Sequence, residues 1–215
     1  MKNIKTAHES KTYHHGNLRD ALIVAAAELI QDSGSVDFAL TDAARKAGVS
    51  NAAPYRHFKD KEELLYCVSE LGFLGLNNQS KAIQSQFQMG SIDAIIALGK
   101  GYMSYVTARP AFFDLMWGER GFKVLEDMDE MHSKLRINGF WTLVNQVEVW
   151  CEEEQIAEAD PMDLSMKLWA MAIGLSHLTI NRQLELFAEN VDPFELLSTS
   201  TQSFLRGVKE TQGKR

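Results

Sequence analysis

Polar and cationic side chains are concentrated in residues 50–61, which read Ser-Asn-Ala-Ala-Pro-Tyr-Arg-His-Phe-Lys-Asp-Lys. Their amide, phenol, imidazole, guanidinium and ammonium groups can donate hydrogen bonds to the phosphates and base edges of DNA. Motifs that mark common catalytic sites are absent from the sequence: it has no HExxH, no GxSxG, no Walker loop and no cysteine–histidine nucleophile pair. His14 and His15 are adjacent, which is not the spacing of two metal ligands on a helix. The residue types therefore favour a binding protein over an enzyme or a metal site.

The surrounding residues predict a helix-turn-helix over about residues 38–58, with helices near 40–47 and 51–58. Four residues would build it. Ala44 is small enough for a helix crossing, and Gly48 tolerates the positive φ of the turn. Val49 is apolar and would fill the space between the helices, and Phe58 would return to the core. These two helices are short, as the motif requires.

The ends of these helices carry one favourable residue and two unusual ones. Ser50 can cap the second helix, and it is also a candidate DNA contact. Ala39 stands where a capping side chain is expected for the first helix, so the cap either shifts to Asp37 or Thr41 or is missing. Pro54 lies inside the second predicted helix, where its lack of an N–H is tolerated if Asn51 is the capping residue.

The first turn of the second helix is expected to lie nearest the bases, because this part of the motif enters the major groove. Asn51 can both donate and accept hydrogen bonds, which suits adenine. The methyl groups of Ala52 and Ala53 can contact a thymine methyl or let the helix approach closely. Arg56 has the reach for either a guanine or a phosphate, and the sequence leaves that choice open.

Three strings in order resemble the TetR family of transcription regulators over about residues 15–75. They are Ala44-Arg-Lys-Ala-Gly-Val-Ser50, Tyr55-Arg-His-Phe58 and Lys61-Glu-Glu-Leu64. The resemblance implies that Tyr55, His57 and Lys61 contact phosphate and that Thr41 contacts a base or a phosphate. It also implies a homodimeric repressor that leaves a palindromic operator when a small apolar or amphipathic ligand binds.

The rest of the chain is predicted to be helical as well, giving an all-α protein of about nine helices. Further helices are expected near residues 61–79, 91–107, 110–117, 124–153, 162–188 and 193–211, with Asp160-Pro161 and Asp192-Pro193 as helix starts. We divide the chain into a flexible basic arm (1–14), a DNA-binding head (15–75) and a ligand-binding and dimerisation body (76–215).

Charge and cysteine content agree with this division. The chain has a net charge of −7, yet residues 1–61 hold nine Lys or Arg against seven Asp or Glu, so the acidic excess belongs to the body. Cys67 and Cys151 lack CxxC spacing and are interpreted as packed thiols. Neither a membrane-spanning run nor a secretory signal is apparent. We therefore expect a cytoplasmic, nucleoid-associated protein that needs no cofactor other than an inducer.

The C-terminal body resembles a TetR subgroup that carries a Trp-His-Gly signature. The run from Trp169 to Leu175 matches it, except that Ile173 stands in place of the histidine. The candidate ligand contacts are Met103, Phe113, Trp117, Trp141, Met171 and His177, although such residues are more often core. The candidate dimer contacts are Leu168, Ala172, Leu175, Leu197 and Leu205. Three alternatives stay open at this point: a regulator without an inducer, an enzyme, and a dimeric binding protein with a vestigial head.

Overall fold

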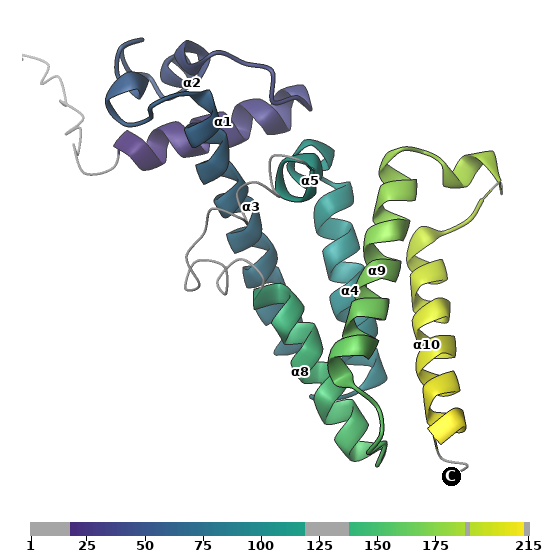
Figure 1. The fold of residues 1–215 in the computed structure, drawn as a ribbon. Coiled ribbons are helices and arrows are strands. Elements are labelled where there is room, and N and C mark those ends of the chain that lie inside the picture. Colours follow the sequence, from purple (N-terminus) through teal and green to yellow (C-terminus); the bar gives the residue numbers. More distant parts are fainter. Residues whose placement is uncertain (1–17, 119–137, 188–189, 213–215) are drawn as a thin grey trace, which may run out of the picture.

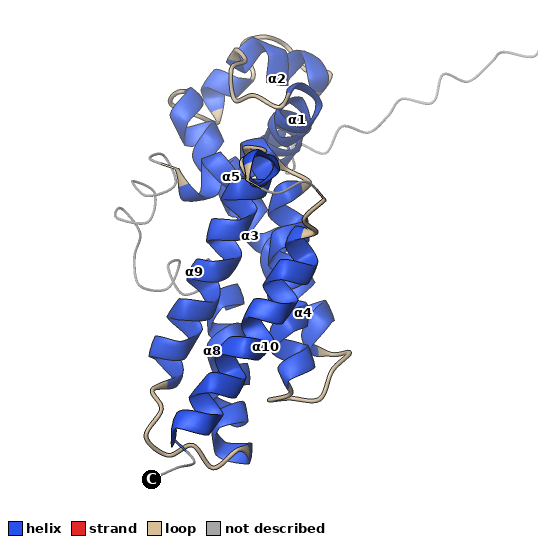
Figure 2. Ribbon diagram, turned by 90° about the vertical axis from the view of Figure 1, so that its right-hand side faces the viewer, coloured by secondary structure: helices blue, strands red, loops and turns tan. Residues whose placement is uncertain are grey.

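A computed structural model describes residues 18–118, 138–187 and 190–212 of the chain. Within these ranges the fold is all-helical, with eight α-helices, two short 3₁₀ helices and no strand, as Figure 2 shows. The α-helices are α1 (Leu18–Ser33), α2 (Leu40–Lys46), α3 (Lys61–Gln84), α4 (Ile92–Thr107), α5 (Pro110–Trp117), α8 (Asn138–Glu153), α9 (Pro161–Ile180) and α10 (Pro193–Gln212). The 3₁₀ helices are η1 (Pro54–Arg56) and η2 (Leu184–Leu186). None of the helices in these ranges is long and apolar enough to span a membrane.

The N-terminal helices form a small head (Figure 1). Helix α1 places Leu22, Ala26 and Ile30 on one buried face, at spacings of four residues. These side chains share one core with Phe58 and with Leu64 of α3. Burial of this face holds α1, α2 and the start of α3 together.

The body consists of long helices packed lengthwise, and α9 contacts α4, α8 and α10 (Figure 1). Two of its helices begin as the sequence predicts. The carboxylate of Asp160 accepts from the Met162 N–H at 2.9 Å, and that of Asp192 accepts from the Phe194 N–H at 2.9 Å. Each aspartate caps a helix whose first residue is proline.

Two predicted helices differ from the structure. The segment expected to be helical over residues 51–58 forms turns around η1, because Pro54 has no N–H to continue an α-helical ladder. The N–H groups of Arg56 and His57 bond three residues back, to Ala53 and Pro54. The helix expected over 162–188 ends at Ile180, and Arg182 follows with a φ of 56°. The first part of the helix expected over 124–153 lies outside the described residues, and so does the predicted arm over 1–14.

Helices α3 and α5 join the head to the body. Leu64 and Leu65 of α3 lie in the head core, whereas Ser80 of the same helix lies in the body. Helix α5 packs Leu115 and Met116 into the core that contains α1. The approach of α5 to α3 is close at Gly72, where an added Cβ would lie 2.8 Å from the Met116 sulfur. A displacement of α3 or α5 would therefore change the packing of both the head and the body.

Candidate nucleic-acid interface and internal cavity

The turn between α2 and the following segment is built from the residues that the sequence singled out. Gly48 has a φ of 70°, and its N–H bonds the Arg45 carbonyl at 3.1 Å. The Val49 N–H then bonds the carbonyl of Ala44, which is completely buried. The side chain of Val49 is half-buried against the head core. The predicted roles of Ala44, Gly48 and Val49 in the turn are confirmed.

The start of α2 is stabilised by a residue that the sequence interpretation missed. Ala39 is the capping position and supplies no side-chain bond. The carboxylate of Asp42 instead accepts from the Ala39 N–H at 2.8 Å. This is one half of a capping box, whose signal is an acidic side chain three residues after the cap.

Residues 50–59 divide into a buried set and an exposed set. Phe58 is 2% exposed and Ala53 is 8% exposed, and Pro54 is buried beside them. The exposed residues are Ser50, Asn51, Ala52, Tyr55, Arg56 and Lys59. We call these six the exposed face of the motif. Among them Tyr55 is 61% exposed, so its phenol lies on the surface of the head and not in the core.

This division corrects two sequence interpretations. Ala53 faces the core, so its methyl group is not available to a base. Ser50 does not cap the next helix through its side chain, since the N-cap of η1 is Ala53 and makes no side-chain bond. The Ser50 carbonyl, by contrast, accepts from the Ala53 N–H at 2.9 Å.

The other three candidate contacts are half-buried at the border of the exposed face. Thr41 lies in the first turn of α2, and His57 follows η1. Lys61 begins α3, and its ammonium lies 4.9 Å from the centroid of the Phe38 ring and 4.0 Å from an Asp37 oxygen. The lysine side chain is 29% exposed, so its charge is close to the surface.

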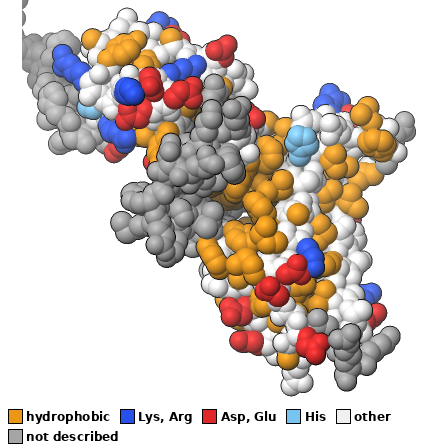
Figure 3. Space-filling view, in the orientation of Figure 1, with side chains coloured by type: hydrophobic (Ala, Val, Ile, Leu, Met, Phe, Trp, Pro, Cys, Tyr) orange, Lys and Arg blue, Asp and Glu red, His pale blue; other side chains and the backbone are white. Residues whose placement is uncertain are grey.

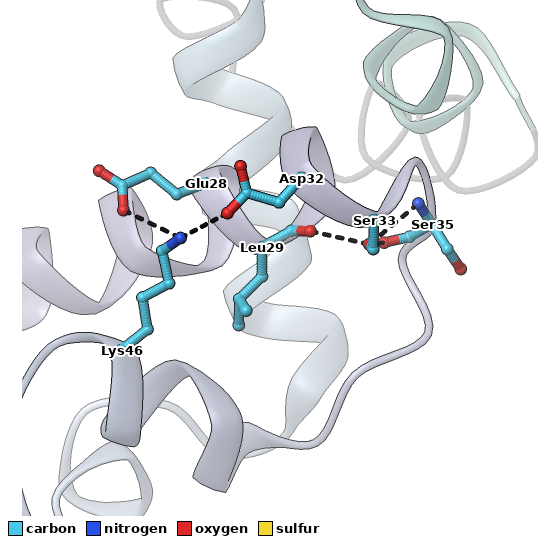
Figure 4. Close-up of polar contacts among 6 residues, drawn as sticks. All are labelled: Glu28, Leu29, Asp32, Ser33, Ser35 and Lys46. Atoms are coloured by element: carbon cyan, nitrogen blue, oxygen red, sulfur yellow. Dashed lines mark hydrogen bonds and ion pairs between the residues drawn. The ribbon is translucent and has the colours of Figure 1, made fainter.

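Carboxylates pair with the two cations in the last turn of α2. The Lys46 ammonium bridges α2 to α1 (Figure 4), at 2.6 Å from Asp32 and 3.5 Å from Glu28. The hydrogen bond to Asp32, together with the charges of both carboxylates, raises the pKa of Lys46. Arg45 is paired with Asp42 at 3.1 Å.

Arg56 and Lys59 form no ion pair in the part of the chain that the structure describes. Their charges are therefore available to an anion. Sequence reasoning put Arg56 among the contacts and omitted Lys59, although Lys59 lies within the same polar segment.

An internal cavity lies in the body and is lined by α3, α4, α5, α8, α9 and α10. Its volume is about 60 Å³, and it is partly open to solvent. Among the described residues the lining is mostly apolar and contains no charged side chain. Trp117 and Trp169 stand edge to face in it, with ring centroids 5.5 Å apart.

Only Trp117 of the six candidate ligand residues lines this cavity. Met103 is completely buried in the core between α4, α9 and α10, and Met171 packs against the same core. Trp141 is 40% exposed, and His177 is exposed beside Asn181. Phe113 is half-buried on α5, away from the lining. These five are not among the described lining residues, and their contact with a ligand stays a prediction.

Four of the five candidate dimer residues are buried in their own chain. Leu168, Ala172, Leu197 and Leu205 are each at most 5% exposed, so they are corrected as interface residues. Leu175 is half-buried, and its place in an interface stays a prediction. Ile173, which replaces the signature histidine, is half-buried on α9. The assignment to the Trp-His-Gly subgroup stays a prediction.

Comparisons with known proteins agree with this arrangement. Residues 22–66 match a family model described as bacterial regulatory proteins, tetR family, and residues 95–200 match one described as tetracyclin repressor-like, C-terminal domain. No curated protein matches the chain.

Solved structures with the same fold cover almost the whole chain. A protein of unknown function from Rhodococcus sp. RHA1 is 24% identical, with a TM-score of 0.76 over 92% of this chain and 98% of that one. The TetR family regulator PfmR from Thermus thermophilus is 20% identical, with a TM-score of 0.56 over 86% and 97%. The TetR-like regulator LfrR from Mycobacterium smegmatis, solved with proflavine, is 15% identical, with a TM-score of 0.57 over 89% and 97%.

Proposed function

Since the chain belongs to the TetR family of DNA-binding transcription regulators, we propose that it is a homodimeric, ligand-controlled repressor. It is a regulator and not an enzyme. In this proposal two heads bind the half-sites of a palindromic operator, and a small ligand in the body releases them. The observation that carries the proposal is the exposed face of the motif, which follows a turn at Gly48 that packs on the buried Ala44.

The exposed face offers both kinds of contact that a DNA-binding protein needs. Asn51 and Ala52 precede η1 and are our candidates for base contacts. Tyr55, Arg56 and Lys59 carry exposed donors, and His57, Lys61 and Thr41 border them, as candidates for phosphate contacts. Lys46 and Arg45 are paired with carboxylates, whereas Arg56 and Lys59 on the exposed face have no ion-pair partner among the described residues and are available to phosphates.

Dimerisation is supported by an uncovered apolar surface on α9 and α10. Met166 is 46% exposed and Leu196 is 37% exposed. Added Cβ atoms at Gly174 and Gly207 would meet nothing within 4 Å, so these helix surfaces are open in the single chain. Apolar side chains gather on this side of the body in Figure 3. A second copy would cover such a surface and place two heads on one duplex.

Release by a ligand is supported by the helices that line the cavity. Helix α3 contributes Leu76 and Ser80 to the lining and begins in the head at Lys61. Trp117 lies at the end of α5, whose Leu115 and Met116 are part of the head core. A ligand that moves either helix would shift the heads relative to each other. The cavity also argues against the alternative of a regulator without an inducer.

Selection of duplexes from a random pool by the purified protein tests the DNA-binding part of the proposal. We expect an inverted repeat to be enriched, and Tyr55→Ala to abolish its selective binding. Lys46→Gln is the matched control in the same head, because its ammonium is already paired with Asp32 and Glu28. Absence of any sequence selectivity at moderate salt would contradict the proposal.

Sedimentation of Met166→Glu tests the dimer. A buried glutamate on this surface should produce monomers. Val24→Glu on α1 is the control, because Val24 has the same exposed fraction of 46%. A monomeric wild-type protein, or an unchanged dimer in Met166→Glu, would exclude this surface as the interface.

A further inference from the structure

Two residues that line the cavity carry buried hydrogen-bond donors without a partner in the described parts of the chain. They are the Tyr102 hydroxyl on α4 and the indole Nε1–H of Trp117 on α5. A buried polar group without a partner is unfavourable, because it has lost its bond to water and gained nothing in exchange. Burial also raises the pKa of Tyr102 above its usual range, so its hydroxyl keeps its proton. Both groups are therefore present as donors.

None of the other polar groups of the described lining, which belong to Ser80, Thr201 and Trp169, is bonded to these donors. The Ser80 hydroxyl already donates to the Leu76 carbonyl at 3.0 Å within α3. Tyr105, one turn along α4 from Tyr102, does not line the cavity, and its hydroxyl donates to the Gly72 carbonyl at 2.9 Å. Of these two tyrosines of α4, only Tyr102, which lines the cavity, therefore has an unpaired hydroxyl.

The lining also determines which charges it can accept. Its fifteen residues include no Asp, Glu, Lys, Arg or His. An ionised ligand would lose its hydration without gaining a counter-charge from this lining, so its binding is strongly disfavoured. Aromatic rings form much of the remaining wall, with Phe140 and Trp169 edge to face at 5.6 Å. Such walls favour a flat or ring-containing apolar body.

We propose that the cavity binds an uncharged, mainly apolar molecule whose carbonyl-type oxygen accepts hydrogen bonds from Tyr102 and Trp117. The inference rests on the ligand-controlled function proposed above and specifies the chemical class of that ligand. Carboxylates and organic cations of the same size are expected to bind weakly, because the described residues of the lining offer them no charged partner. Hydrocarbons of the same size fit, but they leave both donors unpaired.

Four probes with one naphthalene skeleton separate these classes: 2-acetylnaphthalene, 2-ethylnaphthalene, 2-naphthoate and 2-naphthylmethylammonium. Binding to the full-length protein is measured by calorimetry and by quenching of tryptophan fluorescence. The ketone is expected to bind about tenfold more tightly than the hydrocarbon, as one or two neutral hydrogen bonds provide. The two ions are expected to bind about a hundredfold more weakly than the ketone, or not at all.

Tyr102→Phe removes one donor and little else. It should weaken ketone binding by about tenfold and leave binding of the hydrocarbon unchanged. Trp117→Phe should weaken ketone binding in the same way. Tyr105→Phe is the matched control, which removes a hydroxyl from the same helix outside the cavity and should leave ketone affinity at the wild-type value. Thermal unfolding of each variant verifies that it is folded.

The inference is overturned if either ion binds as tightly as the ketone, or if no neutral probe binds at millimolar concentration. Equal ketone affinity for wild type and Tyr102→Phe, with Trp117→Phe also unchanged, overturns it as well. The operator-binding assay without any probe reports on the proposed function separately. A protein that selects its operator but prefers 2-naphthoate would refute only the ligand class, whereas one that binds the ketone but no DNA would refute only the repressor.

Discussion

Replacing Lys61 with glutamine tests whether its charge acts on DNA or only within the head. Its ammonium lies 4.9 Å from the Phe38 ring centroid and 4.0 Å from Asp37, yet its side chain is 29% exposed. If each protomer loses one phosphate contact, a dimer loses two. The plot of log affinity against log salt concentration should then become less steep by about 1.8, since each B-DNA contact contributes about 0.9. A rise in salt concentration from about 50 to 200 mM should therefore weaken operator binding by the variant roughly twelvefold less than it weakens binding by the wild type.

The assay is fluorescence anisotropy with an operator duplex at several salt concentrations, combined with thermal unfolding. Loss of the contact with Phe38 should lower the free energy of unfolding by about 0.5–1 kcal/mol, the value for an exposed cation over an aromatic ring. For a chain of this size, that lowers Tm by at most about 4 °C. Lys46→Gln serves as the control and should keep the wild-type slope, because two carboxylates already neutralise Lys46. A wild-type slope in Lys61→Gln together with a lowered Tm would refute the phosphate contact and assign Lys61 a structural role.

Three further predictions concern the turn, the exposed face and the buried thiols. Tyr55→Phe removes an exposed hydroxyl and should weaken operator binding about thirtyfold, because each protomer loses about 1 kcal/mol of binding free energy. The Tm should not change. Equal operator affinities of variant and wild type would argue against the contact. Gly48→Ala should lower the free energy of unfolding, measured in urea, by about 1 kcal/mol, because a φ of 70° is unfavourable for alanine although the added Cβ would contact no other atom. A wild-type free energy would mean that the turn relaxes. Burial raises the pKa of Cys67 and Cys151, so their stabilisation is full below the ordinary thiol pKa and is lost as pH rises through the raised values. Urea titrations from neutral to alkaline pH should therefore show a steeper loss of stability in wild type than in the double alanine variant, and parallel curves would contradict this.

The helix-turn-helix could be predicted from the sequence because its geometry depends on local chemistry. A positive φ requires Gly48, a close helix crossing requires a residue as small as Ala44, and Asp-Pro pairs cap helices wherever they stand. The turn-forming effect of Pro54 was the exception. Its missing N–H interrupts the bonding pattern of a short helix, which the surrounding polar and apolar pattern does not reveal.

The partners of individual side chains were decided only by tertiary structure. Lys46 is paired because α1 places Glu28 and Asp32 beside it, which the spacing of these residues in the sequence does not show. Ala52 and Ala53 are identical neighbours in sequence, yet only Ala53 is buried. Periodicity identifies the apolar side of a helix, but it does not say which neighbouring element covers that side.

The body shows the same division between sequence and structure. Its helical class and its cap residues followed from the sequence, because apolar spacing and capping act within a few residues. Which apolar residues form core, cavity or outer surface depended on how six helices meet. Trp117 lines the cavity, Met103 fills the core and Met166 faces outward, although all three are large apolar side chains on helices. Their roles differ because burial is a property of the packed assembly of helices and not of the residue type.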